Sequence, residues 1–380
     1  MFSPFTRTNK LKKYISLILL GNLIPATTLA NHWDFQAHGL AGAYYGITRT
    51  KETNKYPNRW ILRSDALLKA DYIFNNNHKS GIHASTTIMF REDDTNRRWG
   101  EYRFYPYFAD TSQYGTVYLG YSYNAAYLLH KGARDITFFK IDDSNMTYFL
   151  NNPNWNNGFK TTKFATPKST TIMNDGRAPK VTYLSPHFYD TQIGFSYTPH
   201  NANRRGMTSR YADYETNEDG YTAGLQKKWQ IESHRIFVSA GYGIFNKTDK
   251  ETSVGLTWEY QNFNIAAGYK KAYIDGSRNR IATPAAISPL PVWFDNYRES
   301  EAWNISTGYK NQTFATNLAF MQTQASNTRH QDNLLIWSNI IPVNDNFNLY
   351  IVGSRLNTHG DTPSDDNDGY GLIFGIGLKF

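Results

Sequence analysis

The sequence contains no cysteine, which excludes disulfide bonds, thiolate metal sites and cysteine nucleophiles. It also lacks any apolar run close to the roughly 20 residues that a membrane-spanning helix needs, and its mean hydropathy is −0.60. No long stretch has the 3.6-residue apolar period of an amphipathic helix. Aromatic residues, in contrast, make up 16% of the 380 residues. A hydrophilic chain so rich in aromatic residues suits strands that are apolar on one face only.

The first thirty residues predict a secretory signal peptide. A short apolar stretch at 14–24 precedes small residues at the −3 and −1 positions of a cut after Ala30, and it follows four basic residues: Arg7, Lys10, Lys12 and Lys13. The alternative is an N-terminal anchor, for which the apolar stretch is too short. Cleavage leaves +4 of the formal net charge of +8, too little to indicate nucleic-acid binding. We therefore expect residues 1–30 to be removed and residues 31–380 to form a single exported domain.

Residues 370–380 alternate between two kinds of side chain. The even positions are apolar throughout, with aromatic rings at both ends (Tyr370 and Phe380), and the odd positions are mostly small. Successive side chains of a strand point to opposite faces. A strand of this length, tilted about 40°, spans roughly 25 Å, the height of the apolar band on a transmembrane barrel. A buried strand of a soluble sandwich alternates in the same way, so this stretch alone does not decide between the two.

Residues 60–74 favour the barrel. Their even positions are apolar apart from Ser64, with rings near both ends, whereas the odd positions carry several charges. An apolar outer face opposite a charged face is typical of a barrel strand that borders a watery lumen. We predict that these charges line a pore wall, and the same parity argument adds one residue from each of two other strands. The predicted wall residues are Arg63, Asp65, Lys69, Asp71, Arg103 and Lys180. The alternative is that they lie in a wide vestibule or an outer loop.

The alternating pattern recurs sixteen times in the mature chain, an even number that a closed single-chain barrel requires. We therefore predict an all-β, antiparallel transmembrane barrel of about 16 strands. Short connections such as 75–81 and 261–262 alternate with long polar ones. The expected strands lie near 33–48, 60–74, 82–91, 101–109, 114–121, 179–185, 191–198, 219–229, 235–245, 252–260, 263–273, 299–309, 313–322, 332–341, 346–356 and 369–380.

One connection, residues 122–178, is too long for a simple loop and contains apolar residues that imply packing. We expect this 122–178 segment to fold into the barrel as a constriction loop, with part of it a short helix. It holds seven basic and four acidic residues, which favours a weak preference for anions. The candidate charges on it are Lys131, Arg134, Asp135, Lys140, Asp142 and Asp143, and the alternative for each is again a place in a vestibule.

Several motifs, in this order, carry a family resemblance: YGTVYLG at 114–120, KVTYLSP at 180–186, GFSYTP at 194–199 and the closing strand at 368–380. With them the chain resembles the general-diffusion porins of the Gram-negative outer membrane, especially those of alphaproteobacteria. The resemblance implies a homotrimer of sixteen-stranded barrels in a membrane of lipid and lipopolysaccharide. It also implies passive diffusion of ions and small hydrophilic solutes without a cofactor, and a terminal Phe380 that the barrel-assembly machinery reads during insertion.

The sequence departs from the family at three places. Tyr121 and Leu184 stand where the family commonly has arginines on the wall, and Asp190-Thr191 stands where a Gly-Phe turn is usual. The 122–178 segment is also not acidic, as the constriction loop usually is. The missing arginines and the charge of the segment bear on the field across the pore and therefore on its ion preference.

Two other classes of function compete with a porin. A hydrolytic barrel needs a positioned nucleophile and base, but the histidines are scattered and no G-x-S-x-G elbow is present. A structural or adhesive barrel requires only that the 122–178 segment fill the lumen. The acidic stretch at 361–369 lacks the ligand spacing of an EF-hand, and we expect a hydrated loop there, which divalent cations can bridge to lipopolysaccharide phosphates, instead of a metal site of the protein itself.

Overall fold

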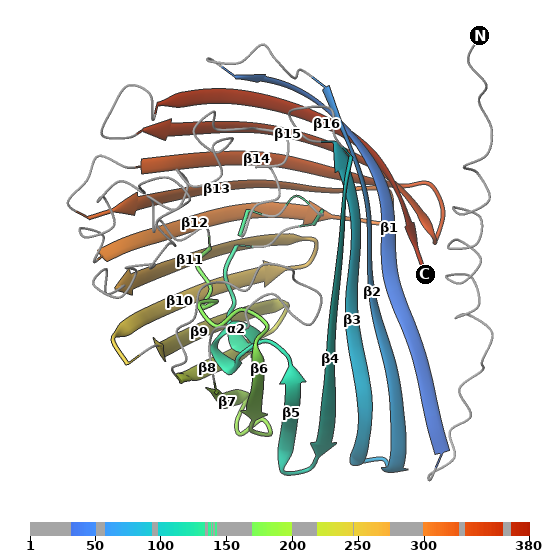
Figure 1. Cartoon of the computed structure of the whole chain (residues 1–380), viewed down its shortest axis with the longest axis vertical. Helices are drawn as coiled ribbons and strands as arrows, with labels where there is room; N and C mark the ends of the chain where they lie inside the picture. Colours follow the sequence, from blue (N-terminus) through green and yellow to red (C-terminus); the bar gives the residue numbers. More distant parts are fainter. Residues whose placement is uncertain are drawn as a thin grey trace, which may run out of the picture.

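The computed structural model describes residues 32–50, 58–92, 98–133, 136–137, 139, 141–142, 169–199, 219–245, 247–273, 299–326, 331–359 and 366–380. Sixteen strands form one closed antiparallel barrel in which β16 pairs with β1 (Figure 1). A short helix, α2 (Ala125–Leu129), lies between β5 and β6 in the chain. The strands are β1 (His32–Thr50), β2 (Asn58–Asn75), β3 (His78–Glu92), β4 (Arg98–Ser112), β5 (Gly115–Tyr121), β6 (Pro179–Leu184), β7 (Thr191–Thr198), β8 (Gly220–Ile231), β9 (His234–Phe245), β10 (Asp249–Tyr260), β11 (Phe263–Tyr273), β12 (Glu299–Lys310), β13 (Ala315–Ala325), β14 (Gln331–Pro342), β15 (Phe347–His359) and β16 (Asn367–Lys379).

All sixteen predicted strands are present, which confirms the fold class. The prediction of a connection over residues 75–81 was wrong, because the real connection is shorter: β2 runs to Asn75 and β3 begins at His78. The side chain of Asn75 accepts a hydrogen bond from the backbone N–H of Asn77 at 2.8 Å and closes a two-residue turn. Gly81 lies inside the ladder opposite Asp71 instead of in the turn.

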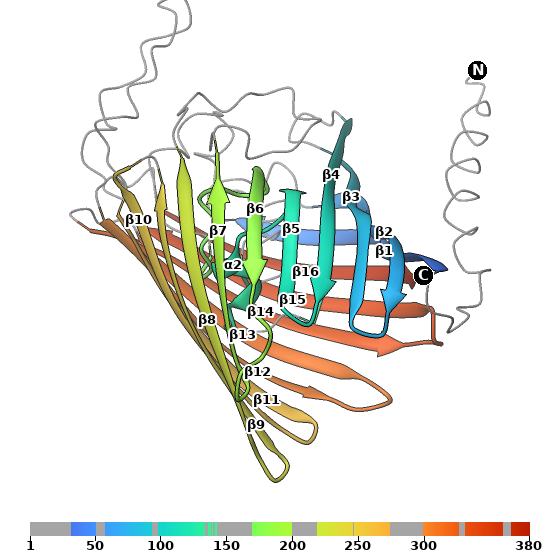
Figure 2. The same cartoon turned by 90° about the horizontal axis from the view of Figure 1, so that it is seen from below.

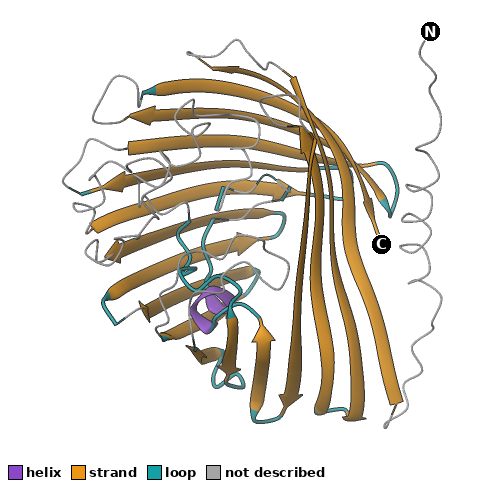
Figure 3. Cartoon of the chain, viewed as in Figure 1, coloured by secondary structure: helices purple, strands orange, loops and turns teal. Residues whose placement is uncertain are grey.

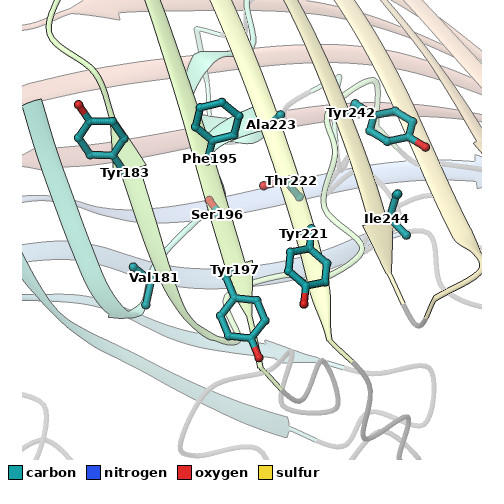
Figure 4. Close-up of a pocket in the computed structure, with 10 residues that line it drawn as sticks. All are labelled: Val181, Tyr183, Phe195, Ser196, Tyr197, Tyr221, Thr222, Ala223, Tyr242 and Ile244. Atoms are coloured by element: carbon teal, nitrogen blue, oxygen red, sulfur yellow. The ribbon is translucent and has the colours of Figure 1, made fainter.

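The outer surface is apolar, as the alternation predicts. In β16, Tyr370, Leu372, Phe374 and Ile376 are exposed on the outside, whereas Ile373 is completely buried. Figure 4 shows the same arrangement on β6 to β9, where a shallow groove of about 410 Å³ is lined by outward side chains. The rings among them are Tyr183, Phe195, Tyr197, Tyr221 and Tyr242, whereas Ser196 and Thr222 point to the other side of the sheet.

The inner face has two different halves. On β1–β3 and β13–β16 its buried side chains form one apolar cluster, the inner apolar cluster: Tyr44, Ile61, Met89, Ala319, Met321, Leu334, Ile336, Tyr350, Val352 and Ile373, joined by Phe139 and Ile141 of the 122–178 segment. On β6–β12 the buried inward residues are mostly serine, threonine, asparagine, glycine and paired charges. The lumen is therefore not uniformly polar, which alternation alone does not reveal.

The two ends of the barrel differ in their connections. Two-residue turns such as Glu232-Ser233 and Gln261-Asn262 join strands at one end, and the strand ends that border the long chain segments 200–218 and 274–298 lie at the other (Figure 2). We call these the turn end and the loop end. Among the described residues, no helix has the length and apolar character to cross a membrane. Figure 3 shows α2, in purple, beside the strands β6 to β8.

Candidate functional site

The described parts of the 122–178 segment are tied together at Asn124. Its Oδ1 accepts from the backbone N–H of Tyr127 at 2.8 Å and caps the N-terminus of α2. Its Nδ2 donates to Asp175 Oδ1 at 2.6 Å and to the carbonyl of Ile172 at 3.1 Å. One buried side chain therefore starts the helix and joins the beginning of the segment to its end.

Small residues on the inner wall make room for α2. A Cβ on Gly224 of β8 would lie 2.8 Å from the carbonyl oxygen of Ala125, closer than real Cβ contacts. Leu184, 8% exposed, packs against Ala125 and Leu129. Leu184 is one of the positions where the resembling porins commonly have arginine. Here an apolar side chain packs against the helix, which covers this part of the wall.

From α2 the segment runs along the inner wall to the inner apolar cluster. Each contact joins it to an inward-facing side chain of another strand: Lys131 N to Ser239 Oγ (2.8 Å), Ala133 N to Asn304 Oδ1 (3.4 Å), Thr137 Oγ1 to Ser338 Oγ (3.3 Å), and the Phe139 ring to the Tyr44 ring (5.1 Å, edge to face). The contacts follow β9, β12, β14 and β1. Both polar and apolar contacts thus hold the segment across the barrel.

Two buried ion pairs hold the segment against the wall: one joins it to β6 directly, and the other, formed between β10 and β11, contacts its backbone. Lys180 Nζ is 3.1 Å from Asp175 Oδ2, with both side chains 0% exposed, and it also donates to the carbonyls of Ser122 and Gly176. Lys270 Nζ is 2.8 Å from Glu251 Oε1 and donates to the carbonyl of Thr171. Lys180 faces the interior, as its parity predicts. The prediction that it lines the pore is nevertheless corrected, because the segment covers it and it anchors that segment.

Asp142 and His130 meet at Thr170. Asp142 accepts from the backbone N–H of Thr170 at 2.9 Å and from Asn304 Nδ2 at 2.8 Å, and Thr170 Oγ1 lies 3.3 Å from His130 Nε2. Burial raises the pKa of Asp142 to about 6, against the hydrogen bonds from Thr170 and the charge of Lys270. Burial lowers the pKa of His130 to about 4, and Lys270 and Lys131 add to this effect.

The opposite wall, on β2 to β4, carries charges that the alternation placed there. Arg63 Nε is 2.5 Å from Asp65 Oδ2, and Thr87 Oγ1 donates to Asp65 Oδ1 at 2.6 Å. Lys69 lies on the same face of β2 and is partly exposed, and Arg103 lies on the inward face of β4 and is exposed. The structure therefore brings four of the predicted wall residues together on adjacent strands.

Asp71, also predicted on this wall, is 2% exposed and does not contact open lumen water. His83 Nε2 lies 2.7 Å from its Oδ1 and Lys79 Nζ lies 3.7 Å from its Oδ2. Sequence analysis missed Lys79 and His83 as wall residues. His83 already has the inward parity within the strand predicted at 82–91, and Lys79 would have been identified as well if the start of that strand had been placed at residue 78.

Arg177 is a second residue that sequence analysis missed. Its guanidinium lies over the rings of Tyr105 (4.6 Å) and Tyr123 (4.1 Å), and Nη1 donates to Ser85 Oγ at 2.6 Å. The end of the 122–178 segment thereby contacts β3 and β4. No local sequence signal marks Arg177, since its partners come from distant parts of the chain.

The remaining predicted residues have mixed outcomes. Lys131 is partly exposed, with its ammonium 5.6 Å from the Phe237 ring. Arg134, Asp135, Lys140 and Asp143 lie outside the described residues, as does the signal peptide predicted at 1–30. The part of the chain that the structure describes contains no group of three or more His, Asp and Glu side chains able to hold a metal ion.

Comparison with known proteins agrees with this architecture. A family model described as Gram-negative porin matches residues 73–336. No curated protein matches the chain. OmpF of Salmonella typhi in complex with daunomycin has a TM-score of 0.60 and 11% identity, over 94% of this chain and 100% of that one. An anion-selective porin from Comamonas acidovorans gives 0.52 and 10%, over 92% and 100%. OmpT of Vibrio cholerae in a trimer form gives 0.50 and 11%, over 93% and 100%.

Proposed function

The chain belongs to the Gram-negative porin family, and from this premise we propose that it forms an open, water-filled pore with a weak preference for anions. As a porin with this barrel, it is an outer-membrane channel for the diffusion of small solutes. The porins of this family are channels and not enzymes. The ion preference, the homotrimer, the export signal and the role of Phe380 are parts of the proposal.

The observation that carries the anion preference is the composition of the β2–β4 wall. Its described inward side chains include four cations, Arg63, Lys69, Lys79 and Arg103, and two carboxylates, Asp65 and Asp71. Each carboxylate has at least one cation beside it. Ions that pass a narrow passage feel such fixed charges strongly, because little water screens them. The surplus of cations on the wall therefore favours anions.

A plugged, structural barrel is the second candidate, and a specific observation favours it. Phe139 and Ile141 are both 0% exposed and pack into the inner apolar cluster, so part of the lumen is filled with a dry core. If the rest of the 122–178 segment fills the remaining space, the barrel carries no current. The predicted lipopolysaccharide contact and the recognition of Phe380 by the assembly machinery are compatible with either candidate.

Conductance in a planar bilayer with a KCl gradient separates the two candidates. We expect the refolded mature protein to insert in steps, with an open pore and a reversal potential of anion-selective sign. If the barrel is correctly folded but shows no conductance, the open-pore proposal is wrong and the plugged barrel is the better description. Cross-linking in native outer membranes tests the homotrimer, and mass measurement of the mature N-terminus tests cleavage after Ala30.

A paired charge reversal tests the wall itself. Lys69→Glu with Arg103→Glu is expected to move the reversal potential toward cations, because it turns two cations of the wall into carboxylates. Lys271→Glu is the matched control, since Lys271 is an exposed cation on the outer face of β11. If the control shifts the potential as much as the pair does, the wall does not set the selectivity.

A further inference from the structure

A pocket of about 460 Å³ lies on the outer surface of the barrel, between β13, β14 and β15. Alternation fixes its side: Leu335 of its lining is 40% exposed, whereas the neighbouring Leu334 and Ile336 point inward and are buried. The pocket therefore faces the membrane and not the lumen. The lining residues are Phe320, Gln322, Gln331, Asn333, Leu335, Arg355 and Asn357.

The pocket straddles the edge of the apolar band. Along the outward face of β13, Leu318 and Phe320 are followed toward the loop end by Gln322. Along β14, Trp337 and Leu335 give way to Asn333 in the same direction. In bacterial outer-membrane barrels the end with longer loops is extracellular. The polar half of the pocket thus lies at headgroup level of the outer leaflet, and its apolar half lies at the level of the acyl chains.

The amide groups of the pocket leave their donors available. Trp303 Nε1 donates to Gln322 Oε1 at 2.8 Å, and an indole N–H can only donate, so this contact fixes which end of the amide is oxygen. Gln331 Nε2 donates to Asn333 Oδ1 at 3.3 Å. Each carbonyl oxygen therefore already accepts one hydrogen bond. Among the described residues, no acceptor takes the amide protons of Gln322 or Asn333.

Arg355 supplies charged donors, and its ion pair with Asp368 balances its charge. Its Nε and Nη2 donate to the two carboxylate oxygens of Asp368, each at 3.3 Å, and its guanidinium lies 5.3 Å from the Tyr370 ring. A guanidinium has five N–H donors, and the contact with Asp368 uses two of them. The side chain is 52% exposed, so a ligand in the pocket reaches the remaining donors.

We propose that this pocket binds the phosphate of an outer-leaflet lipid headgroup and that the lipid's acyl chain lies along Phe320 and Leu335. Asn357 Oδ1, an acceptor without a hydrogen-bond partner, is buried, so the polar groups that a ligand can reach are the donors of Gln322, Asn333 and Arg355. They match a ligand that only accepts, and a phosphate does so with a charge that strengthens each bond. A purely polar solute would leave Phe320 and Leu335, the apolar half of the pocket, without a partner. A lipid, unlike free phosphate, satisfies both halves.

The absence of cysteine provides a clean test, because one introduced cysteine carries one fluorophore. Leu318→Cys places the label on the outer face below the pocket, and Leu256→Cys places it at the matching distance from the loop end of β10. Both proteins are reconstituted in phosphatidylcholine vesicles with a minor fraction of either brominated phosphatidic acid or brominated phosphatidylcholine. We expect phosphatidic acid to quench the label at 318 about threefold more than phosphatidylcholine does, and both lipids to quench equally at 256.

Variants assign this enrichment to the pocket. Arg355→Gln and, independently, Gln322→Leu are expected to abolish it, whereas Lys271→Gln, which also removes an ion-paired cation from the outer loop-end surface, leaves it unchanged. Gln322→Leu keeps every charge, so a folding defect from the lost Arg355–Asp368 pair does not obscure the result. Equal quenching by both lipids at 318, or equal loss in all three variants, overturns the proposal. If adding inorganic phosphate abolishes the enrichment, the pocket binds a free anion, and the proposal that its ligand is a lipid is overturned.

Discussion

Asp142 and His130 contact the same hydroxyl, that of Thr170, and their titrations oppose each other. The folded pKa of Asp142 is raised to about 6, so the stability from its protonation is complete below about pH 4, the unfolded value, and is lost as the pH rises through 6. The folded pKa of His130 is lowered to about 4, so its contribution is complete above about pH 6.5 and is lost as the pH falls through 4.

We therefore predict that each single variant exposes the slope of the other group. Relative to the parent protein, His130→Gln should make the free energy of unfolding fall by up to about 3 kcal/mol between pH 4 and 6, because of these two groups only Asp142 then titrates. Asp142→Asn should make it rise by a similar amount over the same range. Urea unfolding of the two variants and the parent protein at several pH values measures this. Parallel pH profiles for all three proteins would contradict the opposed titration.

The buried Lys180–Asp175 pair gives a second prediction at this scale. Lys180→Met should destabilise the protein by about 3 kcal/mol or more, because Asp175 is left charged with no exposure to water. Lys180→Met combined with Asp175→Asn should recover a large part of this loss, since the amide still bonds to Asn124 and Thr198 without a charge. Urea unfolding of both variants measures the coupling. Strictly additive losses would mean that the pair does not act as a unit.

At the scale of elements, two different kinds of packing hold the 122–178 segment. Its beginning is a helix seated on glycines and a leucine of the wall, where backbone approaches backbone. Its far part inserts Phe139 into the inner apolar cluster, against Tyr44. The polar contacts lie between these two sites. Loss of either packing contact should leave the strands paired but change the path that the 122–178 segment takes through the lumen.

Phe139→Ala tests the second site. We expect a loss of about 3 kcal/mol in the free energy of unfolding, from the cavity that the ring leaves, and noisier or larger single-channel currents, because the segment is released from the wall. Phe195→Ala is the matched control, as the same truncation at a ring that is 55% exposed on the outer face. Unchanged currents in Phe139→Ala would show that this contact does not position the segment.

At the scale of the whole molecule, closure depends on the junction between β1 and β16. Gly39 N donates to the carbonyl of Phe380 at 2.8 Å, and Phe380 N donates back to Gly39 at 3.2 Å. A Cβ on Gly39 would lie 2.2 Å from the ring carbon Cζ of Phe380 and 2.7 Å from the backbone oxygen of Asp65. Only glycine therefore lets the terminal ring cover the junction.

Gly39→Ala should lower the stability of the barrel by about 1–3 kcal/mol and reduce its refolding yield, because the ring and the backbone have to move. Gly353→Ala is the control, since a Cβ there meets only the Trp337 ring at an ordinary 3.5 Å. Adding Phe380→Ala should relieve part of the Gly39→Ala defect if the ring is the obstacle. Heat-modifiability on gels and urea unfolding measure both effects, and equal defects in the two glycine variants would refute the argument.

The sequence by itself determined the strands, the outer and inner faces and the closed barrel. Alternation with period two is local, so Arg63 and Asp65 were assigned to the inner face, and Tyr370 and Phe374 to the outer face, without any distant contact. The class of protein followed from the same local signal repeated sixteen times.

Only the tertiary structure decided which inward side chains meet water. Lys180 and Leu184 have the inward parity of a pore wall, yet both lie under the 122–178 segment. The dry half of the lumen likewise arises where Phe139 meets Tyr44 and Ile336 from strands far away in the sequence. Burial inside a barrel depends on what crosses the lumen, and such long-range contacts leave no periodic trace in the strands themselves.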